Sequence, residues 1–433
     1  MPWASSSICR APIDQGPTAC RRTLLITNTE SGIAPGDRVR SKIRQQQKPN
    51  RRPGSKTVRF HKLSRRDALK TATALLSVCV SARSLGLSAA AQVPEKIVLG
   101  TIPIIPTIGS YVGEVDFFKE EGLTVELTRF NNFAPIMQAM TAGNLLAGDF
   151  GVVGSIIGLT RGLPLIAPFL TFFSTPSHPV ERIMVMQNSP IKILDDLKGK
   201  KLAFLGPGTV PDMFLGALPK RTKIRKEEID LVPMPNPNMP DALAQGLVDA
   251  IFAIPPADTV AEQKYKARTV ANATDLVPYA GLGTVALRRD FAEGHPEAAK
   301  KLLRACIRFN RWIDDNPADA RKAITKNLGL PQDLAREARI PLCSRNGLPV
   351  MPSVWHLYEM MVQVKTIDPH PDPAKLFNDG IIEPTKRFTL PVVEELGLEP
   401  DPEIEKMLKG HYPFLPKPVE SYYADWERRL LKM

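Results

Sequence analysis

The sequence predicts an α/β protein with two lobes, each a mostly parallel sheet covered by helices on both faces. Short apolar segments typical of buried strands alternate with helical segments from residue 96 onward, the order that places parallel strands in one sheet. The same alternation begins again after residue 186. The 342 residues that follow position 91 exceed the size at which one hydrophobic core stops growing, so two lobes are expected.

The first lobe is expected to span residues 95–188. It opens with Ile97, Val98 and Leu99, a short apolar run suited to a buried strand. A second strand follows, in which apolar and polar residues alternate, and the strand, loop and helix scheme then continues. The predicted strands are 96–100, 122–127, 147–153 and 165–172, and the predicted helices are 111–121, 133–141 and 154–162.

The second lobe is expected to span residues 189–282 and to follow the same scheme. The segment that ends at Phe204 is predicted to be its first strand, and it leads into a loop that contains Gly206 and Gly208. The other predicted elements are helices 211–219 and 239–246 and strands 229–233 and 250–254.

The chain is then expected to return to the first lobe over residues 283–383. A strand is predicted at 281–287, and residues 296–314 carry apolar side chains at helical spacing. Residues 384–433 are rich in proline and charge, and we expect them to form a C-terminal extension that wraps the protein or trails from it.

An export signal precedes the first lobe. Residues Ser64–Lys70 read Ser-Arg-Arg-Asp-Ala-Leu-Lys and are followed by a mostly apolar stretch that ends in three alanines. This resembles a bacterial twin-arginine signal, with Ala68 in place of the usual Phe. Small residues at Ala89 and Ala91 admit a signal peptidase, so we expect residues 58–91 to be a signal peptide cleaved near Ala91.

Two other interpretations of this segment are less favoured. A membrane anchor needs about 18 uncharged residues, and Arg83 interrupts the apolar run. A lipoprotein signal needs a small residue where Val78 stands, directly before Cys79. Residues 1–57 are expected to be either a miscalled start or a disordered arm.

The charge of the chain depends on this division. The whole sequence has a net charge of +12, which alone favours a nucleic-acid or anionic-membrane partner. Residues 1–91 hold 17 Lys and Arg against 4 Asp and Glu, which leaves 40 basic and 41 acidic residues in the remainder. The exported chain is therefore nearly neutral, and no nucleic-acid partner is expected.

Several short motifs occur in a recognisable order. In this order they resemble the periplasmic substrate-binding proteins of ABC importers, the group for nitrate, sulfonate, taurine and thiamine precursors, which is similar to the thiamine-pyrimidine synthases, over roughly residues 95–340. The resemblance implies a two-lobed (type II) periplasmic binding protein whose lobes close over a ligand cleft between them. The motifs are Val98–Ser110, Phe117–Leu123, Ala139–Asp149, Asp195–Lys200, Gly246–Ala250 and His295–Glu297.

The candidate site lies at the carboxyl ends of the strands, where helix N-termini offer backbone N–H groups. Hydroxyls at these loops either contact the ligand or act as ordinary helix caps. Arg182 either clamps a carboxylate or sulfonate or forms a hinge salt bridge with Glu181 or another acid. Phe133 and Phe173 are expected to flank an apolar ligand body. The candidate ligand-binding residues are Thr107, Ser110, Asn132, Phe133, Gly154, Ser155, Thr209, Asp212, Pro255 and Arg182.

No catalytic set is evident in the sequence, so we expect a non-enzyme without cofactor or metal. His356 and Glu359 lie one helical turn apart but lack a third ligand at useful spacing. The loop at 206–208 lacks the Gly-Lys-Ser/Thr ending of a nucleotide-binding loop. The enzyme alternative, similar to a thiamine-pyrimidine synthase, carries a cysteine-rich motif that Cys306 and Cys343 cannot compose. These two cysteines either pair in an oxidising periplasm or pack as buried thiols.

The predicted function is that of a periplasmic solute-binding receptor that delivers a small organic anion, sulfonate- or carboxylate-like, to an ABC importer. The cleft loops are poor in Lys and Arg, which disfavours an inorganic anion such as nitrate. The expected partners are the ligand, the permease and ATPase subunits of the importer, and the twin-arginine translocase during export. The alternative within the same fold is the ligand-sensing partner of a membrane receptor.

Overall fold

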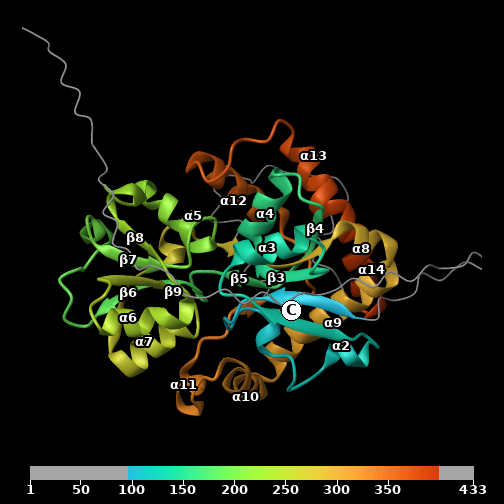
Figure 1. Ribbon diagram of the computed structural model, residues 1–433, viewed down its shortest axis with the longest axis horizontal. Coiled ribbons are helices and arrows are strands. Elements are labelled where there is room, and N and C mark those ends of the chain that lie inside the picture. Colours follow the sequence, from blue (N-terminus) through green and yellow to red (C-terminus); the bar gives the residue numbers. More distant parts are fainter. Residues whose placement is uncertain (1–95, 399–433) are drawn as a thin grey trace, which may run out of the picture. The chain divides into compact units, whose positions relative to one another are not determined.

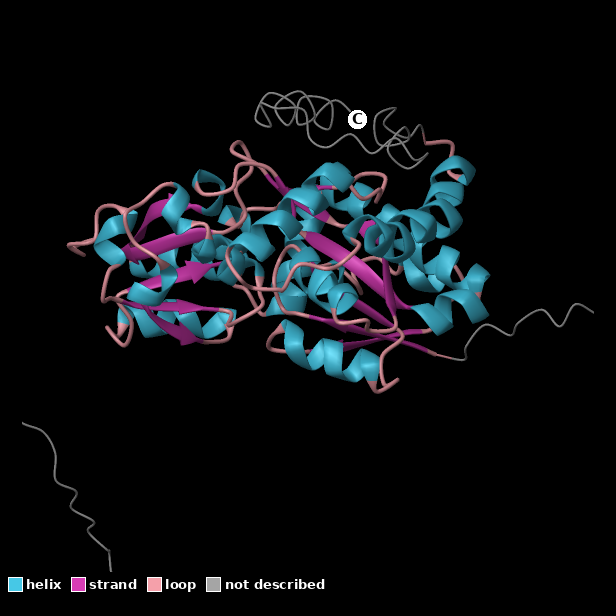
Figure 2. Ribbon diagram, turned by 90° about the horizontal axis from the view of Figure 1, so that it is seen from above, coloured by secondary structure: helices cyan, strands magenta, loops and turns pink. Residues whose placement is uncertain are grey.

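The computed structural model describes residues 96–398 and shows an α/β protein built on two five-stranded sheets and a small third sheet (Figure 1). Figure 2 shows the strands of the two large sheets as separate groups, each accompanied by helices. We call these two parts lobe 1 and lobe 2, in chain order. The predicted N-terminal extension (1–57), the predicted signal peptide (58–91) and residues 399–433 lie outside the described residues.

Lobe 1 is built on a sheet with the strand order β2-β1-β3-β12-β4. β1 pairs in parallel with both β2 and β3, whereas β12 lies antiparallel between β3 and β4. β12 is the strand that returns from lobe 2, and it alone runs in the opposite direction to the other strands of this sheet. The strands are β1 (Ile97–Thr101), β2 (Val125–Arg129), β3 (Ala147–Gly151), β4 (Leu165–Leu170) and β12 (Gly283–Arg288).

Lobe 2 repeats this arrangement with the order β10-β6-β9-β7-β8. β7 pairs in parallel with β8 and β9, and β6 lies antiparallel between β9 and β10. β6 enters from lobe 1, so in each lobe the incoming strand is the opposed one. The strands are β6 (Arg182–Met186), β7 (Lys201–Phe204), β8 (Asp230–Pro233), β9 (Ala250–Ala253) and β10 (Ala267–Asn272). The sequence analysis places the start of this lobe slightly later, at residue 189.

The chain crosses between the lobes twice, beside the third sheet. In that sheet β5 (Phe172–Ser174) lies between β11 (Ala280–Gly281) and β13 (Leu342–Cys343), antiparallel to both. The first crossing runs over residues 175–181, from β5 to β6, and the second over residues 273–279, from β10 to β11. Both crossings therefore leave or enter one short sheet, which ties the two lobes together.

Helices cover the two large sheets (Figure 1). The longest, α9, was predicted at 296–314 and buries the apolar face that its sequence pattern indicated, including Phe309 at the centre of an aromatic contact with Phe117. The helices are α2 (Phe117–Glu120), α3 (Phe133–Thr141), α4 (Val152–Thr160), α5 (Val210–Gly216), α6 (Met239–Ala244), α7 (Ala257–Tyr265), α8 (Arg289–Gly294), α9 (Pro296–Asp315), α10 (Pro317–Leu328), α11 (Gln332–Glu337), α12 (Met351–Gln363), α13 (Pro373–Phe377) and α14 (Leu390–Glu395).

Two predicted elements of lobe 1 differ from the structure. The helix predicted at 111–121 is reduced to α2, because Gly113 has a φ of +103° and Asp116 caps the helix by accepting a hydrogen bond from Lys119 N. The strand predicted at 147–153 ends at Gly151, where α4 begins. Both differences shorten an element at a glycine.

The segment after α13 lies against lobe 1. Two π-helical turns, Asn378–Ile382 and Thr385–Thr389, lead into α14. The hydroxyls of Thr385 and Thr389 donate to the carbonyl of Pro168 in β4, over 3.3 and 2.6 Å. Residues 384–398 of the predicted C-terminal extension are therefore docked on the first sheet.

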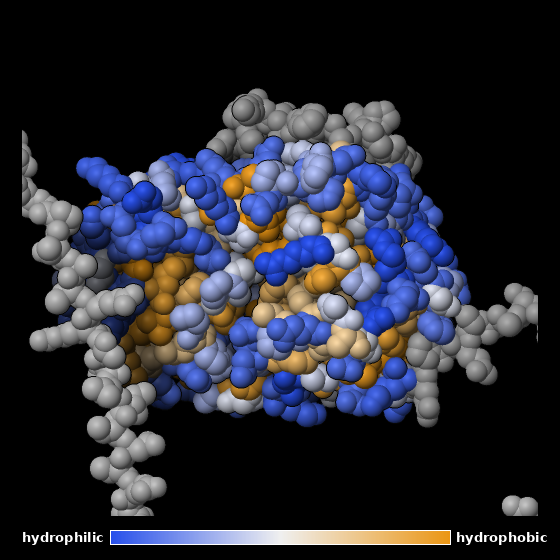
Figure 3. Space-filling model, turned by 45° about the horizontal axis from the view of Figure 1, so that its top comes forward, coloured by the Kyte–Doolittle hydropathy of each residue, from blue (hydrophilic) through white to orange (hydrophobic). Residues whose placement is uncertain are grey.

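Hydrophilic residues cover most of the face shown in Figure 3, with apolar residues visible between them. Among the described residues, Ile193 and Leu247 are the large apolar side chains that are exposed. Cys306 and Cys343 are both free and buried, which matches the expectation of packed thiols. Within residues 96–398 we find no helix of the length and apolar character needed to cross a membrane.

Candidate ligand cleft

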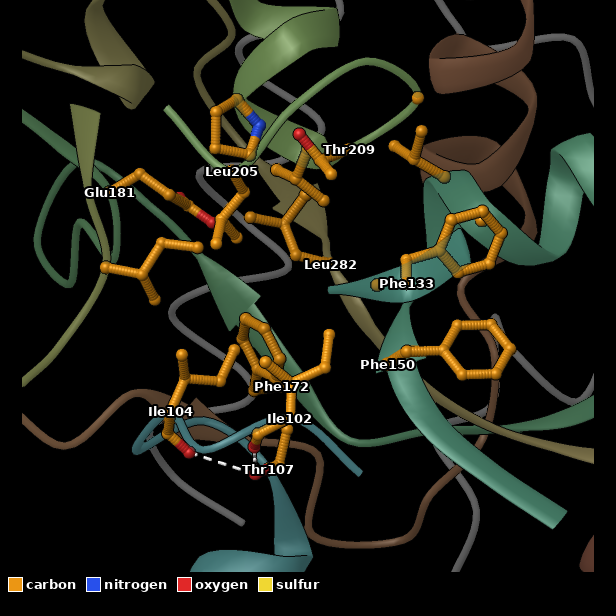
Figure 4. Close-up of a pocket in the computed structure, with 17 residues that line it drawn as sticks. Ile102, Ile104, Thr107, Phe133, Phe150, Phe172, Glu181, Leu205, Thr209 and Leu282 are labelled. Carbon is orange, nitrogen blue, oxygen red and sulfur yellow. Dashed lines mark hydrogen bonds between the residues drawn. The ribbon is translucent and has the colours of Figure 1, made fainter. Parts of the chain in front are cut away.

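A cavity lies where loops of lobe 1 and lobe 2 meet beside the crossing segments (Figure 4). The space between its lining atoms is about 550 Å³, part of it open to solvent. Both lobes and the crossing segments contribute to the wall, with lobe 1 on one side and lobe 2 on the other. The lining residues are Ile102, Ile104, Thr107, Phe133, Phe150, Gly151, Val153 and Gly154 from lobe 1, Phe172, Glu181 and Leu282 from the crossing segments and the small sheet, and Leu205, Gly208, Thr209, Val210, Pro211 and Ile254 from lobe 2.

The loop after β1 forms the lower wall of the cavity in Figure 4, with Thr107 labelled there. The Thr107 hydroxyl lies 2.9 Å from the carbonyls of both Ile102 and Ile104. Ser110 does not line the cavity, since its hydroxyl donates to Ile104 O over 2.7 Å. The loop is thus held by its own hydroxyls, and Thr107 is the predicted contact that the structure places at the cavity.

Phe133 at the start of α3 and Gly154 in α4 form an aromatic corner. A Cβ atom on Gly154 would lie 2.2 Å from the Phe133 ring, so only glycine allows the ring to lie against this helix. The Phe133 and Phe150 ring centroids are 5.3 Å apart. Asn132 and Ser155, predicted with these residues, lie beside the corner and not in the wall, and each has a buried oxygen without a hydrogen-bond partner.

The loop after β7 supplies the lobe 2 wall. Thr209 lines the cavity and its hydroxyl donates to Gly206 O over 2.6 Å. Asp212 is turned away from the cavity and accepts hydrogen bonds from Gly208 N over 2.9 Å and from Lys226 Nζ over 3.0 Å. Asp212 therefore stabilises the loop from a position outside the cavity lining.

Pro255 follows β9 and precedes a cis peptide bond to Pro256. It does not line the cavity, but its carbonyl accepts a hydrogen bond from Ile105 N over 2.9 Å. Ile105 lies in the loop after β1, so this bond joins lobe 1 to lobe 2. The two lobes are therefore in direct contact at this point.

Arg182, at the start of β6, lies outside the cavity wall and forms an ion pair. Its Nε and Nη2 donate to Asp258 Oδ2 over 3.0 and 2.8 Å, and its Nη1 lies 2.8 Å from Glu262. Arg339, from the segment after α11, also donates to Asp258 Oδ2 over 3.0 and 2.7 Å. Of the two roles expected for Arg182, the structure has the salt bridge, with Asp258 as partner.

Glu181 is a charged lining residue that the sequence reasoning missed, since it was considered only as a partner for Arg182. Its side chain lines the cavity, is 1% exposed, and has an Oε2 atom without a hydrogen-bond partner. Burial raises the pKa of this carboxyl to about 8, although the Ser174 hydroxyl and Arg339 lower it. Its position directly before the crossing strand β6 was the available signal.

The apolar lining residues were also missed as a site. Ile102, Ile104 and Leu282 flank strands and look like core in sequence. Phe173 was expected beside the ligand, whereas Phe172 lines the cavity and Phe173 is buried elsewhere. Successive strand residues point to opposite faces, so an error of one position selects the wrong side chain.

The wall is mostly apolar, and Glu181 is the one ionisable side chain among the described lining residues. Residues 96–398 contain no group of three or more His, Cys, Asp and Glu side chains placed to hold a metal ion. The arrangement is suited to enclosing a small apolar body rather than to activating a nucleophile.

Comparisons with known proteins agree with this geometry. A family model described as NMT1/THI5 like matches residues 107–320. The taurine-binding periplasmic protein of Escherichia coli (strain K12) is 27% identical over 201 residues, which are 46% of this chain and 61% of that protein. The match thus spans about three fifths of that relative.

Two solved structures show the same fold. The alkanesulfonate-binding protein of Xanthomonas axonopodis pv. citri, bound to MOPS, has a TM-score of 0.53 at 18% identity, covering 65% of this chain and 98% of that one. The periplasmic nitrate-binding protein of Synechocystis PCC 6803 has a TM-score of 0.60 at 14% identity, covering 70% and 89%. The predicted resemblance and the predicted two-lobed fold of the periplasmic binding proteins are confirmed.

Proposed function

From the NMT1/THI5-like match over residues 107–320 and the periplasmic binding protein fold, we propose that this chain is a solute-binding receptor of an ABC importer. The single observation that supports this most is the cavity between the lobes, to which both lobes and a crossing segment contribute. A receptor that captures solute by lobe closure needs this arrangement and needs no catalytic group.

The partners and location belong to the same proposal. The permease and ATPase subunits of the importer are the expected partners at the inner membrane, and the periplasm is the expected location. Export through the twin-arginine translocase, with cleavage near Ala91, rests on the motif Ser64–Lys70, which lies outside the described residues.

The ligand is proposed to have a small apolar or aromatic body, because Phe133, Phe150 and Phe172 line the cavity. The names of the relatives mention taurine and aliphatic sulfonates, which contain the anionic group expected from the sequence. A ligand-sensing role beside a membrane receptor uses the same cavity, and neighbouring permease and ATPase genes would distinguish the two roles. The named relatives are binding proteins, which leaves the thiamine-pyrimidine synthase alternative without support.

A thermal-shift screen tests the proposal. Alkyl- and arylsulfonates, carboxylates, amines, alcohols, nitrate and pyrimidines are added to the full chain, because a compound that binds only the folded state raises the melting temperature. At least one organic compound is expected to do so.

A matched pair of variants links the shift to the cavity. Gly154→Val places side-chain atoms where Phe133 lies, and we expect it to abolish the shift. Gly294→Val changes a position with no atom within 4 Å of an added Cβ and should keep the shift. A shift that survives Gly154→Val would place binding outside this cavity.

A further inference from the structure

We propose that the solute carries an amine, attached to a small apolar body, and that the amine binds the carboxylate of Glu181 inside the cavity. This rests on the receptor function proposed above and names the chemical class of its solute. It departs from the anionic group expected from the sequence. Three features lead to it: the position of Glu181, the partners of the nearby arginines, and the use of the backbone N–H groups at the cleft.

Glu181 offers the cavity one carboxyl oxygen, Oε2, that has no hydrogen-bond partner in the protein. Figure 4 shows its carboxyl directed into the interior, toward Leu205. The side chain is almost fully buried and Oε2 lacks a hydrogen-bond partner. An ionised carboxyl that is buried without a partner costs free energy. A ligand group that brings both a donor and a positive charge to this atom therefore binds its ionised form most favourably. An ammonium group brings both.

The arginines near Glu181 are bound to another carboxylate. Arg182 and Arg339 each direct Nε and Nη2 at Asp258 Oδ2, over 2.7 to 3.0 Å, and neither lines the cavity. Asp258 is fully buried between them. These guanidinium groups therefore do not present a bidentate clamp to a sulfonate or carboxylate in the cavity.

Three backbone N–H groups near the cleft, those of Gly109, Val152 and Gly208, already have acceptors. In related geometries such groups hold anions, yet here all three donate to groups of the protein itself. An anion at any of these places would have to displace a carboxylate or a carbonyl. The pairs are Gly109 N with Asp149 Oδ2 (3.3 Å), Val152 N with Leu282 O (2.7 Å) and Gly208 N with Asp212 Oδ2 (2.9 Å).

The apolar wall fits the rest of such a ligand. Phe133 and Phe150 lie in contact across one side, and Phe172 lines the cavity from the small sheet. Aromatic rings accommodate an apolar body and also attract a cation through their faces. An anion, by contrast, would meet neither a cationic side chain among the described lining residues nor an aromatic face that favours it.

The amine assignment also predicts how binding depends on pH. Burial raises the pKa of Glu181 to about 8, and the negative charge of Asp258 adds to this. The Ser174 hydroxyl and the positive charge of Arg339 lower the pKa. Arg182 is the next residue along the chain, at the start of β6. The carboxyl is therefore mostly protonated at pH 6. An ammonium binds the ionised form, so its affinity should rise with pH, by at most about tenfold per unit, until the carboxyl is ionised near pH 8. A neutral ligand has no such dependence.

Calorimetry on the full chain with three matched probes tests this. Benzylamine, benzyl alcohol and benzenesulfonate share one ring and differ in charge. At pH 8 we expect benzylamine to bind at least about tenfold more tightly than benzenesulfonate, and to weaken at pH 6 while benzyl alcohol does not. Glu181→Gln should weaken benzylamine by about tenfold or more and change benzyl alcohol by less than about threefold. Glu262→Gln, outside the cavity wall, should leave both unchanged.

The outcomes separate this inference from the receptor function. Tighter binding of benzenesulfonate than of benzylamine, or undiminished benzylamine binding by Glu181→Gln, overturns the amine assignment and leaves the receptor in place. No binding by any compound of any charge, including the wider screen, overturns the receptor function and the inference with it. If Glu181→Gln does not fold, the wild-type protein decides: a flat pH profile for benzylamine contradicts the assignment.

Discussion

Lobe 1 and lobe 2 have the same strand order, and the loops after β1 and β7, the central parallel strands, reach the cavity through a threonine, Thr107 in one and Thr209 in the other. Each threonine hydroxyl donates to carbonyls of its own loop, and each loop has an N–H group that donates to an aspartate. The repeated sheet thus produces the same loop construction twice.

The two aspartates differ in what surrounds them. Asp212 comes from α5 itself and forms an ion pair with Lys226. Asp149 comes from the neighbouring strand β3, is buried, and has its pKa raised to about 7 because burial outweighs the N–H groups of Gly109 and Ile108. The comparison teaches that acids from different elements can accept from the same kind of loop N–H group, and that neighbouring side chains decide whether the charge of the acid is compensated.

The largest expected effect concerns Asp258 of lobe 2, which is buried between two arginines. Asp258→Ala leaves Arg182 and Arg339 without their shared acceptor, and we expect a loss of about 3–5 kcal/mol in the free energy of unfolding. Urea unfolding followed by circular dichroism measures it.

The control for this variant is Glu262→Ala. Glu262 contacts only the outer side of the same Arg182 and its side chain is 45% exposed, so a loss of about 1 kcal/mol or less is expected. Equal losses from the two variants would contradict the larger contribution expected from the buried partner Asp258.

The next effect is the dependence of the free energy of unfolding on pH. In lobe 1 the contributing residue is Asp149. The pKa values of Asp149 and Glu181 are raised from 3.8 and 4.5 to about 7 and 8, so the folded protein binds protons that the unfolded chain releases. Their stabilisation is complete below about pH 4 and is lost as the pH rises toward 8. Asp149→Asn should flatten this decline between pH 5 and 8 by on the order of 2 kcal/mol.

Melting temperatures across this range measure the decline. Asp196→Asn is the control, because the N–H groups of Lys192 and Ile193 lower the pKa of Asp196, which keeps it ionised throughout. A wild-type protein whose stability does not fall from pH 5 to 8 would contradict this account of the buried acids.

The smallest effect compares the two threonines. Thr107→Val removes a hydroxyl that lies within hydrogen-bonding distance of two carbonyls, and Thr209→Val removes one that contacts a single carbonyl. Losses of about 1–2 and about 1 kcal/mol in the free energy of unfolding are expected. Denaturant titration checks the order, and a larger loss at Thr209 would show that the loops are not held alike.

The order of elements could be predicted from sequence because the apolar periodicity of each segment reflects its burial. The helix predicted at 296–314 is α9 (Pro296–Asp315), and the strand predicted at 250–254 is β9 (Ala250–Ala253). Turn chemistry was the weaker signal, as the loss of most of the helix predicted at 111–121 shows.

The cavity was predictable only in part. Thr107, Phe133, Gly154 and Thr209 lie in its wall, because loops at the carboxyl ends of strands converge there. The partner of Arg182, by contrast, is Asp258, which lies 76 residues away and is chosen by tertiary packing that no local pattern encodes.

The most direct test of the central claim is a distance measurement across the cleft. Cysteines carrying spin labels are placed at Asn131 and Asn238, exposed positions that follow β2 in lobe 1 and β8 in lobe 2, in a chain whose N-terminal Cys9, Cys20 and Cys79 are serine. Cys306 and Cys343 are buried and can stay. The compound that raises the melting temperature most is then added, with the Gly154→Val variant as control. The account predicts that the distance between the labels shortens on binding and does not change in Gly154→Val; an unchanged distance at saturating compound would contradict a receptor that closes on its solute.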